Sequence, residues 1–241
     1  MKVNKNSQEY ELRYELGQFY TSDDLVDKII KLFNIDFSEK AVLEPSCGSG
    51  AFVHAIQRNF KNVKMTAVDI DPTVEKEYDK AETEFICDDF LGHKFDKKFD
   101  VVIGNPPFNL KTKHNYYDTT EGFIVKSLEL LAPNGDMLLV LPSTVLRNKQ
   151  YQPVREHIVA NYKVEAIMDT SKYYFLGADI ETIALHIKNT RVATQSYSYI
   201  KDNKKEYVFW VKNERCTLHV NNLQEFNDIT KKIGKYTIGD L

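Results

Sequence analysis

The sequence predicts an α/β protein that is built around an open, mostly parallel β-sheet. Short apolar, β-prone runs alternate along the chain with segments in which apolar residues recur at helical spacing. Glycine-rich or acidic turns directly follow several of these runs, which is where open α/β sheets place their ligands. With 241 residues, 42% of them hydrophobic and 28% charged, the chain can bury a substantial core. One α/β domain with a small appendage is therefore expected.

The spacing of apolar residues predicts the elements in order. Ser22 or Thr21 can cap the first of the expected helices. Its apolar face consists of Leu25, Val26, Ile29, Ile30 and Phe33. Strands are expected at residues 40–43, 65–68, 84–87, 99–103, 136–141, 164–168 and 180–187. Further helices are expected at residues 51–60, 120–132 and 149–160, and residues 8–16 are expected to form a short helix or arm.

The chain changes character after the last of these strands. Residues 1–189 are expected to form the main domain and residues 190–241 a small α+β extension. Within the extension, strands are expected at residues 197–200, 207–211 and 216–220, and a helix at residues 222–232.

The overall charge and the cysteines narrow the possible partners and setting. A formal net charge of -3 gives no global attraction to nucleic acid or to an anionic membrane, so any polyanion site has to be a local basic patch. Residues 1–8 are polar and no apolar run approaches membrane-spanning length, so no membrane partner is expected. Cys47, Cys87 and Cys216 form no close-spaced metal-binding pattern, so no metal site is expected. A reduced, cytoplasmic setting is the simplest inference.

The turn after the first predicted strand has the composition of a ligand-binding loop. Residues 44–52 read Glu-Pro-Ser-Cys-Gly-Ser-Gly-Ala-Phe, and small residues let the backbone turn sharply and approach a ligand closely. The helix that follows offers N–H groups and a positive partial charge to an anionic group such as a carboxylate. A glycine turn alone is weak evidence, but the strand before it, the helix after it and Glu44 strengthen the prediction.

Acidic residues end the next two predicted strands. Asp69 lies about twenty residues beyond the glycines, where a nucleotide-binding α/β unit places the acid that binds ribose hydroxyls. Asp71 precedes Pro72 and is interpreted as a helix cap. Asp88 and Asp89 follow the third strand. Adjacent acids are usually solvated turn residues, but here a carboxylate can accept from an adenine amino group.

Residues 103–108, Ile-Gly-Asn-Pro-Pro-Phe, form a stiff loop at the end of the fourth strand. Two consecutive prolines fix φ and remove two backbone donors, so Asn105 is held extended and Phe108 is expected to project outward. A polar amide, bare carbonyls and an aromatic face then meet at the rim of the sheet. For this stretch alone, a rigid turn without a function is the alternative.

Two later loops bear on a possible nucleic-acid substrate. Lys111, Lys113 and His114 precede a tyrosine pair, and alternating basic and aromatic residues are typical of a loop that contacts phosphates. A solvated loop is the alternative. Residues 173–177, Tyr-Tyr-Phe-Leu-Gly, come directly before the strand at residues 180–187, and their aromatic pair is either a core plug or a ligand face.

In this order, the motifs resemble those of the gamma-class adenine-N6 DNA methyltransferases. They are Gly17 to Thr21, Glu44 to Phe52, Asp69 to Pro72, Asp89-Phe90 and Asn105 to Phe108, and the resemblance covers residues 15–188. It implies a Rossmann-like class I methyltransferase fold, with a mostly parallel seven-stranded sheet, an antiparallel last strand and helices on both faces. It also implies S-adenosylmethionine as the cofactor.

The resemblance assigns a role to each matching residue. Thr21 and the turn from Glu44 to Gly50 would hold the methionine part of the cofactor, and Asp69 would bind its ribose. The cofactor-binding set so implied is Thr21, Glu44, Pro45, Ser46, Cys47, Gly48, Gly50, Asp69, Ile70, Asp89, Phe90, Asn105 and Pro107. The catalytic residues so implied are Asn105, Pro106 and Phe108, and the substrate base or DNA would contact Phe108, Lys111, Lys113 and Phe175.

The chemistry of an aromatic amino group supports Asn105 as the main catalytic residue. Its nitrogen lone pair is delocalised into the ring, so the group is a poor nucleophile. The Asn105 side-chain oxygen and the Pro106 carbonyl can each accept one of its hydrogens, which makes the transfer a positioning task. The base has to leave the duplex, and Phe108 would stack on it. Such stacking is worth about 1–3 kcal/mol.

The substrate and the end of the chain leave alternatives. Ile238 to Leu241 resembles the lead-in to a target-recognition domain, and then the sequence stops. We therefore expect a catalytic fragment, or a core that relies on a separate recognition subunit, with weak and salt-sensitive binding to double-stranded DNA. A restriction-modification-related DNA methyltransferase is the leading hypothesis. Methylation of an RNA base or a protein glutamine is the first alternative, and a non-catalytic methyltransferase-like adaptor is the second.

Overall fold

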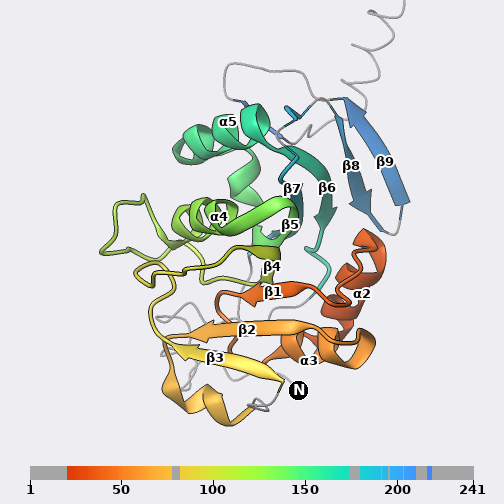
Figure 1. The fold of residues 1–241 in the computed structure, drawn as a ribbon. Coiled ribbons are helices and arrows are strands. Elements are labelled where there is room, and N and C mark those ends of the chain that lie inside the picture. The colour runs from red at the N-terminus through yellow and green to blue at the C-terminus, as the bar shows by residue number, and fades with distance from the viewer. Residues whose placement is uncertain are drawn as a thin grey trace, which may run out of the picture.

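The computed structural model describes residues 21–77, 82–173, 180–190, 192–194, 196–202, 204–209 and 216–218. Its centre is a nine-stranded sheet in the order β3-β2-β1-β4-β5-β7-β6-β8-β9 (Figure 1). The strands are β1 (Ala41–Glu44), β2 (Lys64–Asp69), β3 (Thr83–Cys87), β4 (Phe99–Gly104), β5 (Leu131–Pro142), β6 (Lys163–Asp169), β7 (Thr182–Lys188), β8 (Ser196–Lys201) and β9 (Lys204–Phe209). The α-helices are α2 (Asp23–Phe33), α3 (Ala51–Asn59), α4 (Thr119–Leu130) and α5 (Gln152–Asn161), and the 3₁₀ helices are η1 (Pro72–Glu77), η2 (Ser143–Leu146) and η3 (Lys149–Tyr151).

The strand order explains why this sheet can carry a ligand site. β1 pairs in parallel with β2 on one side and with β4 on the other, so the chain winds outward from β1 in both directions. Such a switch point opens a crevice at the carboxyl ends of the strands. β7 lies antiparallel between β5 and β6. The expected mostly parallel sheet with an antiparallel seventh strand is confirmed.

The sheet is two strands wider than the seven that were expected. β8 pairs in parallel with β6, and β9 pairs antiparallel with β8. Both strands fall in the expected C-terminal extension, and they continue the main sheet. Residues 216–218, which were expected to begin a further strand, are not in one. The domain boundary after residue 189 stays a prediction.

Two apolar layers hold the helices against the sheet. α2 and α3 cover one face, and α4 and α5 cover the other (Figure 1). The face predicted for the first helix is buried, with Leu25, Val26, Ile29 and Ile30 at most 8% exposed. β4 is a nearly continuous apolar run because a parallel strand in the middle of such a sheet is covered on both sides.

The junction of α4 and β5 differs from the expected boundary. The helix expected over residues 120–132 ends at Leu130, and Leu131 already pairs with β4. Glycine is required at position 135, since a Cβ there would lie 2.9 Å from Ala132 O. Pro133, Asn134 and Gly135 are residues typical of a turn, but in the structure they belong to β5.

Some expected features lie outside the described residues. They are the helix or arm at residues 8–16, the loop residue Phe175 and the helix at residues 222–232. None of the described helices combines the length and the apolar character that crossing a bilayer requires.

Candidate active site

A cavity of about 660 Å³ opens at the carboxyl ends of β1, β2, β3 and β4. It brings together most of the residues expected at a cofactor: Thr21, Glu44, Pro45, Ser46, Cys47, Gly48, Asp69, Ile70, Asp89, Phe90, Asn105 and Pro107. Lys111 and Lys113 also line it, whereas Gly50, Pro106 and Phe108 do not. Residues that are far apart in the sequence therefore meet at the switch point of the sheet.

The turn after β1 is shaped for close approach by a ligand. Gly48 and Gly50 have φ values of 47° and 83°, in the left-handed region that favours glycine. Cys47 N donates to Val68 O at 2.9 Å, and Gly50 N donates to Cys47 O at 2.8 Å, which closes the turn. α3 begins at Ala51, and its N-cap residue, Gly50, has no side chain to cap it. The Glu44 carboxyl accepts from Val53 N, and the earlier N–H groups of the first turn can be offered to an anion.

Glu44 places a buried carboxyl group in the cavity. Its side chain is 2% exposed, and no described residue donates a hydrogen bond to its Oε2. Burial raises the pKa of Glu44 well above its usual value, and the charge of Asp69 adds to the shift, while a hydrogen bond from Val53 N opposes it. A buried carboxyl oxygen that lacks a partner among the described residues suits a cationic ligand group such as an ammonium.

Asp69 supports the glycine turn and also faces the cavity. Its Oδ2 accepts from Gly48 N at 2.8 Å, and its Oδ1 accepts from Asp71 N at 2.9 Å. Each carboxylate oxygen has a second lone pair, so both can also accept from a hydroxyl group. Asp71 Oδ1 accepts from Thr73 N at 2.8 Å, in agreement with the capping role expected for it. Beside them Ile70 is 69% exposed and offers apolar surface to a ligand.

Asn105 lies at the edge of the cavity, directly after β4. Its Nδ2 donates to Thr21 Oγ1 at 3.1 Å, and its carbonyl oxygen accepts from Ser46 Oγ at 3.4 Å. Gly104 lets the end of β4 approach the glycine turn, because a Cβ there would lie 3.2 Å from Pro45 Cδ. Asn105 is thus held through its side chain to the segment before α2 and through its backbone to the turn after β1.

The proline pair is anchored to the start of α4. Thr119 Oγ1 donates to Pro107 O at 3.0 Å. The buried hydroxyl of Tyr151 lies 2.8 Å from Asn109 Oδ1 and 2.6 Å from Asp118 Oδ2. The loop therefore owes its rigidity to these contacts as well as to the fixed φ angles of the prolines.

Phe108 does not project outward, and that expectation is wrong. Its side chain is 5% exposed and belongs to the apolar cluster beneath α2 and α3. Packing is favoured because an exposed phenyl ring would leave a large apolar surface in water. Stacking of Phe108 on a base stays a prediction, and it requires the ring to be uncovered.

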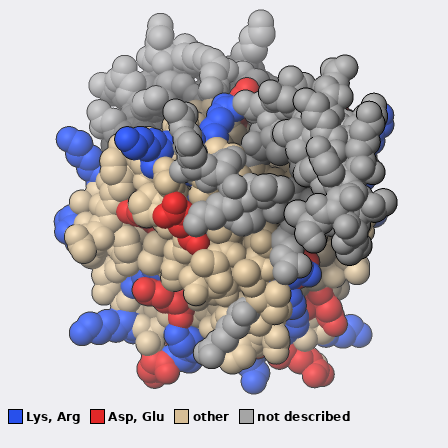
Figure 2. Space-filling view, turned by 90° about the horizontal axis from the view of Figure 1, so that it is seen from above, with Lys and Arg blue, Asp and Glu red and all other residues tan. Residues whose placement is uncertain are grey.

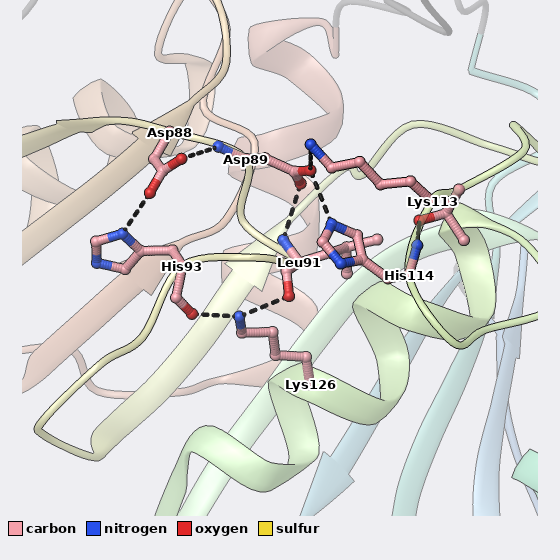
Figure 3. Close-up of polar contacts among 8 residues, drawn as sticks. Asp88, Asp89, Leu91, His93, Lys113, His114 and Lys126 are labelled. Carbon is pink, nitrogen blue, oxygen red and sulfur yellow. Dashed lines mark hydrogen bonds and ion pairs between the residues drawn. The ribbon is translucent and has the colours of Figure 1, made fainter.

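Asp89 is bound by the loop that follows Asn105 (Figure 3). Its Oδ1 accepts from Leu91 N at 3.1 Å, and its Oδ2 accepts from His114 Nε2 at 2.9 Å. The Lys113 ammonium lies 3.4 Å from the same Oδ2. Burial acts to raise the pKa of Asp89, but these hydrogen bonds outweigh it and hold the pKa below its usual value. Lys113, which was expected at DNA phosphates, thus contacts the cavity, and its role at DNA stays a prediction.

Phe90 lines the same end of the cavity and is packed from behind by α4. Its ring centroid lies 4.8 Å from that of Phe123, and the Lys126 ammonium lies 5.1 Å from it. Lys126 Nζ donates to Leu91 O at 3.1 Å, and burial lowers the pKa of Lys126. Phe123 also lines the cavity. Sequence reasoning missed Phe123 because its helical spacing indicates only a core position.

Neither the charges on one face of the molecule nor its described metal-binding residue types indicate a further site. On the face seen in Figure 2, the coloured Lys and Arg side chains are interspersed with those of Asp and Glu. Within the described part of the chain, His, Cys, Asp and Glu side chains form no group of three that could hold a metal ion.

Comparison with known proteins identifies the family of the chain. The model of the Eco57I restriction-modification methylase family matches residues 31–176, which is more than half of the chain. The chain belongs to the Eco57I restriction-modification methylase family. The matched segment contains the glycine turn, both acidic strand ends and the Asn-Pro-Pro-Phe loop.

Two curated methyltransferases and one solved structure are similar to this Eco57I-family chain. It is 29% identical over 187 residues to the type II methyltransferase M.CvrRI of Paramecium bursaria Chlorella virus XZ-6E, a match that covers 73% of this chain and 49% of that protein. It is 25% identical over 209 residues to the modification methylase CviBIII of Paramecium bursaria Chlorella virus NC1A, covering 78% and 54%. The fold is similar to that of the type I restriction-modification methyltransferase subunit from Streptococcus thermophilus, with a TM-score of 0.65, 15% identity, and coverage of 98% of this chain and 60% of that chain. The chain spans about half the length of the curated relatives it matches.

The Eco57I family and the class I fold imply S-adenosylmethionine as the cofactor. The residues of the cavity suit this molecule. Glu44 has a buried oxygen that lacks a partner among the described residues, which suits an ammonium group. Asp69 has lone pairs for ribose hydroxyls, and Ile70 offers exposed apolar surface to a purine ring.

Proposed function

We propose that the chain is the catalytic core of a DNA methyltransferase that methylates the N6 amino group of a flipped adenine. The observation that carries this proposal is the position of Asn105. Asn105 lies at the edge of the cavity, where its side-chain nitrogen donates to Thr21 Oγ1 and its backbone carbonyl accepts from Ser46 Oγ. The family to which the chain belongs supports the reaction class.

The cofactor-binding roles are part of this proposal. Glu44 and the turn that follows it hold the methionine part, and Asp69 accepts from the ribose hydroxyls. Ile70 packs on the purine, and Asp89 accepts from its amino group, with Phe90 lining that end. When bound, the cofactor supplies a methyl group on a positively charged sulfur.

The residues of the Asn-Pro-Pro-Phe loop orient the substrate amino group. The Asn105 side-chain oxygen and the Pro106 carbonyl each accept one of its hydrogens, so the nitrogen lone pair is directed away from the ring plane. The contact with Thr21 restrains rotation of the Asn105 amide, and the contact of Thr119 with Pro107 restrains the loop. No strong base is required, since the proton can leave after the nitrogen has become cationic. Restraint of this kind lowers the barrier by positioning.

Delivery of the base requires elements beyond this cavity. An adenine inside a duplex cannot reach Asn105, so it has to be flipped out and held by Phe108 and Phe175. A net charge of -3 and the mixed charges in Figure 2 favour weak, salt-sensitive binding to DNA, with phosphate contacts from Lys111 and Lys113. Sequence recognition then comes from a separate subunit or from a further domain. A role in restriction-modification follows from the same proposal.

Methyl transfer from labelled cofactor tests the substrate class. The purified chain is incubated with labelled S-adenosylmethionine and, in parallel, with DNA, RNA and protein extract. Label in DNA that is sensitive to salt is the expected result. Label only in RNA or only in protein would reject DNA as the substrate, and an absence of cofactor binding in calorimetry would favour the non-catalytic adaptor.

A further inference from the structure

The loop that follows Asn105 holds Asp89 from two directions (Figure 3). His114 Nε2 lies 2.9 Å from Asp89 Oδ2, yet His114 is not among the residues that line the cavity. Lys113 reaches the same oxygen at 3.4 Å and does line the cavity. His114 therefore contacts the carboxylate from outside the cavity, and Lys113 contacts it from inside.

The side chain of His114 is held in place by packing against Gly92 and by hydrogen bonds of its own backbone. Its ring lies against Gly92, where a Cβ would come within 3.2 Å of His114 Cε1. Its backbone N–H donates to Thr112 Oγ1 at 3.1 Å, and its carbonyl accepts from Tyr116 N at 2.8 Å. The side chain is only 23% exposed. The ring is thus fixed by its own backbone and by the space above Gly92.

The nearby Tyr116 packs in the same way against a glycine of α4, Gly122. A Cβ on Gly122 would lie 2.9 Å from Tyr116 Cδ2 and 3.0 Å from Leu91 Cδ1. Two glycines, one after β3 and one in α4, therefore accommodate the same loop. A side chain at either position would move the loop and with it the imidazole.

The chemistry of the pair assigns its protons. The pKa of Asp89 lies below its usual value, so the carboxylate is ionised and can only accept hydrogen bonds. His114 Nε2 must therefore donate. Leu91 N donates to Oδ1, and His114 donates to one lone pair of Oδ2. The second lone pair of Oδ2 is contacted by the Lys113 ammonium. The Lys113 side chain is 77% exposed, and an ion pair of this kind is weak and readily exchanged.

We propose that His114 is a positioning residue for recognition of the adenine of the cofactor. It fixes the Asp89 carboxylate so that a lone pair of Oδ2 faces the cavity and can accept from the amino group. In the free chain the Lys113 ammonium interacts with that lone pair, and the adenine amino group replaces it when the cofactor binds. This inference rests on the proposed function, because it takes S-adenosylmethionine as the ligand, and it adds the residue that orients the acceptor.

Calorimetry of the full chain with two ligands tests the proposal. One ligand is S-adenosylhomocysteine, and the other is its analogue in which a hydrogen replaces the amino group of the purine. His114→Ala should weaken the binding of S-adenosylhomocysteine about tenfold, the factor that corresponds to one hydrogen bond of ordinary strength. Binding of the analogue should stay within about twofold of wild type, because the analogue has no amino group for Asp89 to accept from.

Three variants of the same region serve as controls. His114→Gln keeps a donor near the position of Nε2 and should restore most of the affinity for S-adenosylhomocysteine. Lys113→Ala removes only the exchangeable cation, so S-adenosylhomocysteine should bind equally or up to about fivefold more tightly. Gly92→Ala displaces the imidazole without removing it and should reproduce the ligand-selective loss. It replaces His114→Ala if thermal melting shows that His114→Ala does not fold.

Three results would overturn the proposal. Equal weakening of both ligands would mean that His114 supports the cavity in general, and tighter binding of S-adenosylhomocysteine by His114→Ala would mean that His114 competes with the adenine. Failure of the wild-type chain to bind S-adenosylhomocysteine would overturn the proposed function together with this inference. A selective loss in His114→Ala without any methyl transfer to DNA would support this inference and reject only the proposed substrate.

Discussion

Thr21 Oγ1 lies 3.1 Å from Asn105 Nδ2, although 84 residues separate the two in the sequence. The contact joins the segment before α2 to the loop after β4, and both residues line the cavity. An amide that is bound through its nitrogen cannot rotate freely about its side-chain bonds. The position of the Asn105 side-chain oxygen therefore depends on the Thr21 hydroxyl.

Thr21→Val keeps the shape of the side chain and removes the hydroxyl. We expect the rate of methyl transfer to fall about tenfold, the effect of one lost hydrogen bond, because the Asn105 amide is no longer restrained. The affinity for S-adenosylhomocysteine, measured by calorimetry, should change less than the rate. Thr21→Ser keeps the hydroxyl and is the matched control. Equal losses in both variants would count against a role of the hydroxyl.

Phe108→Leu separates base capture from core packing. Phe108 is buried, so truncation to alanine would cost about 3–5 kcal/mol of stability and obscure the functional effect. Leucine retains most of the apolar contact, but it cannot stack on a purine, which is worth about 1–3 kcal/mol per base. We expect a folded variant with a reduced fluorescence signal from 2-aminopurine placed at the target position. Unchanged turnover on duplex DNA would argue against stacking by Phe108.

Glu44→Gln should stabilise the free chain at alkaline pH and weaken cofactor binding. The pKa of Glu44 is raised above its usual value of 4.5 by burial. The stability that its protonation provides is fully present below pH 4.5 and is lost as the pH rises through the pKa in the folded state. Glutamine is neutral throughout, so this loss should disappear in urea unfolding measured at pH 5 and pH 8. A variant that is less stable than wild type at pH 8 would contradict the assignment.

Asp136, on the middle strand β5, should make the fold sensitive to acid. It lies 2.8 Å from His186 Nε2 and 3.0 Å from Lys188 Nζ. Burial acts to raise the pKa of Asp136, but these contacts hold it below its usual value of 3.8. The contribution of ionised Asp136 to the free energy of unfolding is therefore present above pH 3.8. It is lost as the pH falls through the lower pKa of the folded state.

Asp136→Asn should remove most of this contribution. We expect it to lower the free energy of unfolding at pH 7 by about 1–3 kcal/mol, because His186 and Lys188 lose a charged acceptor. The difference from wild type should shrink as the pH falls below the pKa of the folded state. Chemical denaturation across this range measures it, and a constant difference at every pH would show that the effect is one of packing.

The elements of the fold could be predicted because buried parallel strands have a simple signature. β4 is a nearly continuous apolar run, and α2 presents Leu25 and Ile29 on one face, so local sequence determines both elements. The partner strand of β8 could not be predicted in this way. Its alternation indicates a strand, but its place beside β6 depends on the order of the whole sheet.

In the candidate active site too, some features follow from local sequence and others depend on tertiary packing. Asp69, Asn105 and the glycine turn follow strands directly, so the topology of the sheet brings them together. The contact between His114 and Asp89 could not be predicted, because it depends on the path of a loop and on the space above Gly92. The burial of Phe108 was missed for a related reason. Proline geometry determines the backbone of that loop, but tertiary packing determines where the ring lies.

Identification of the methylated product tests the central claim most directly. DNA is incubated with S-adenosylmethionine and the wild-type chain or Asn105→Ala, digested to nucleosides and analysed by mass spectrometry. We predict N6-methyladenine with the wild-type chain and none with Asn105→Ala, while calorimetry shows that the variant binds S-adenosylhomocysteine nearly as well as the wild type does. N6-methyladenine formed equally by Asn105→Ala, or a wild-type product methylated at another position, would contradict the account.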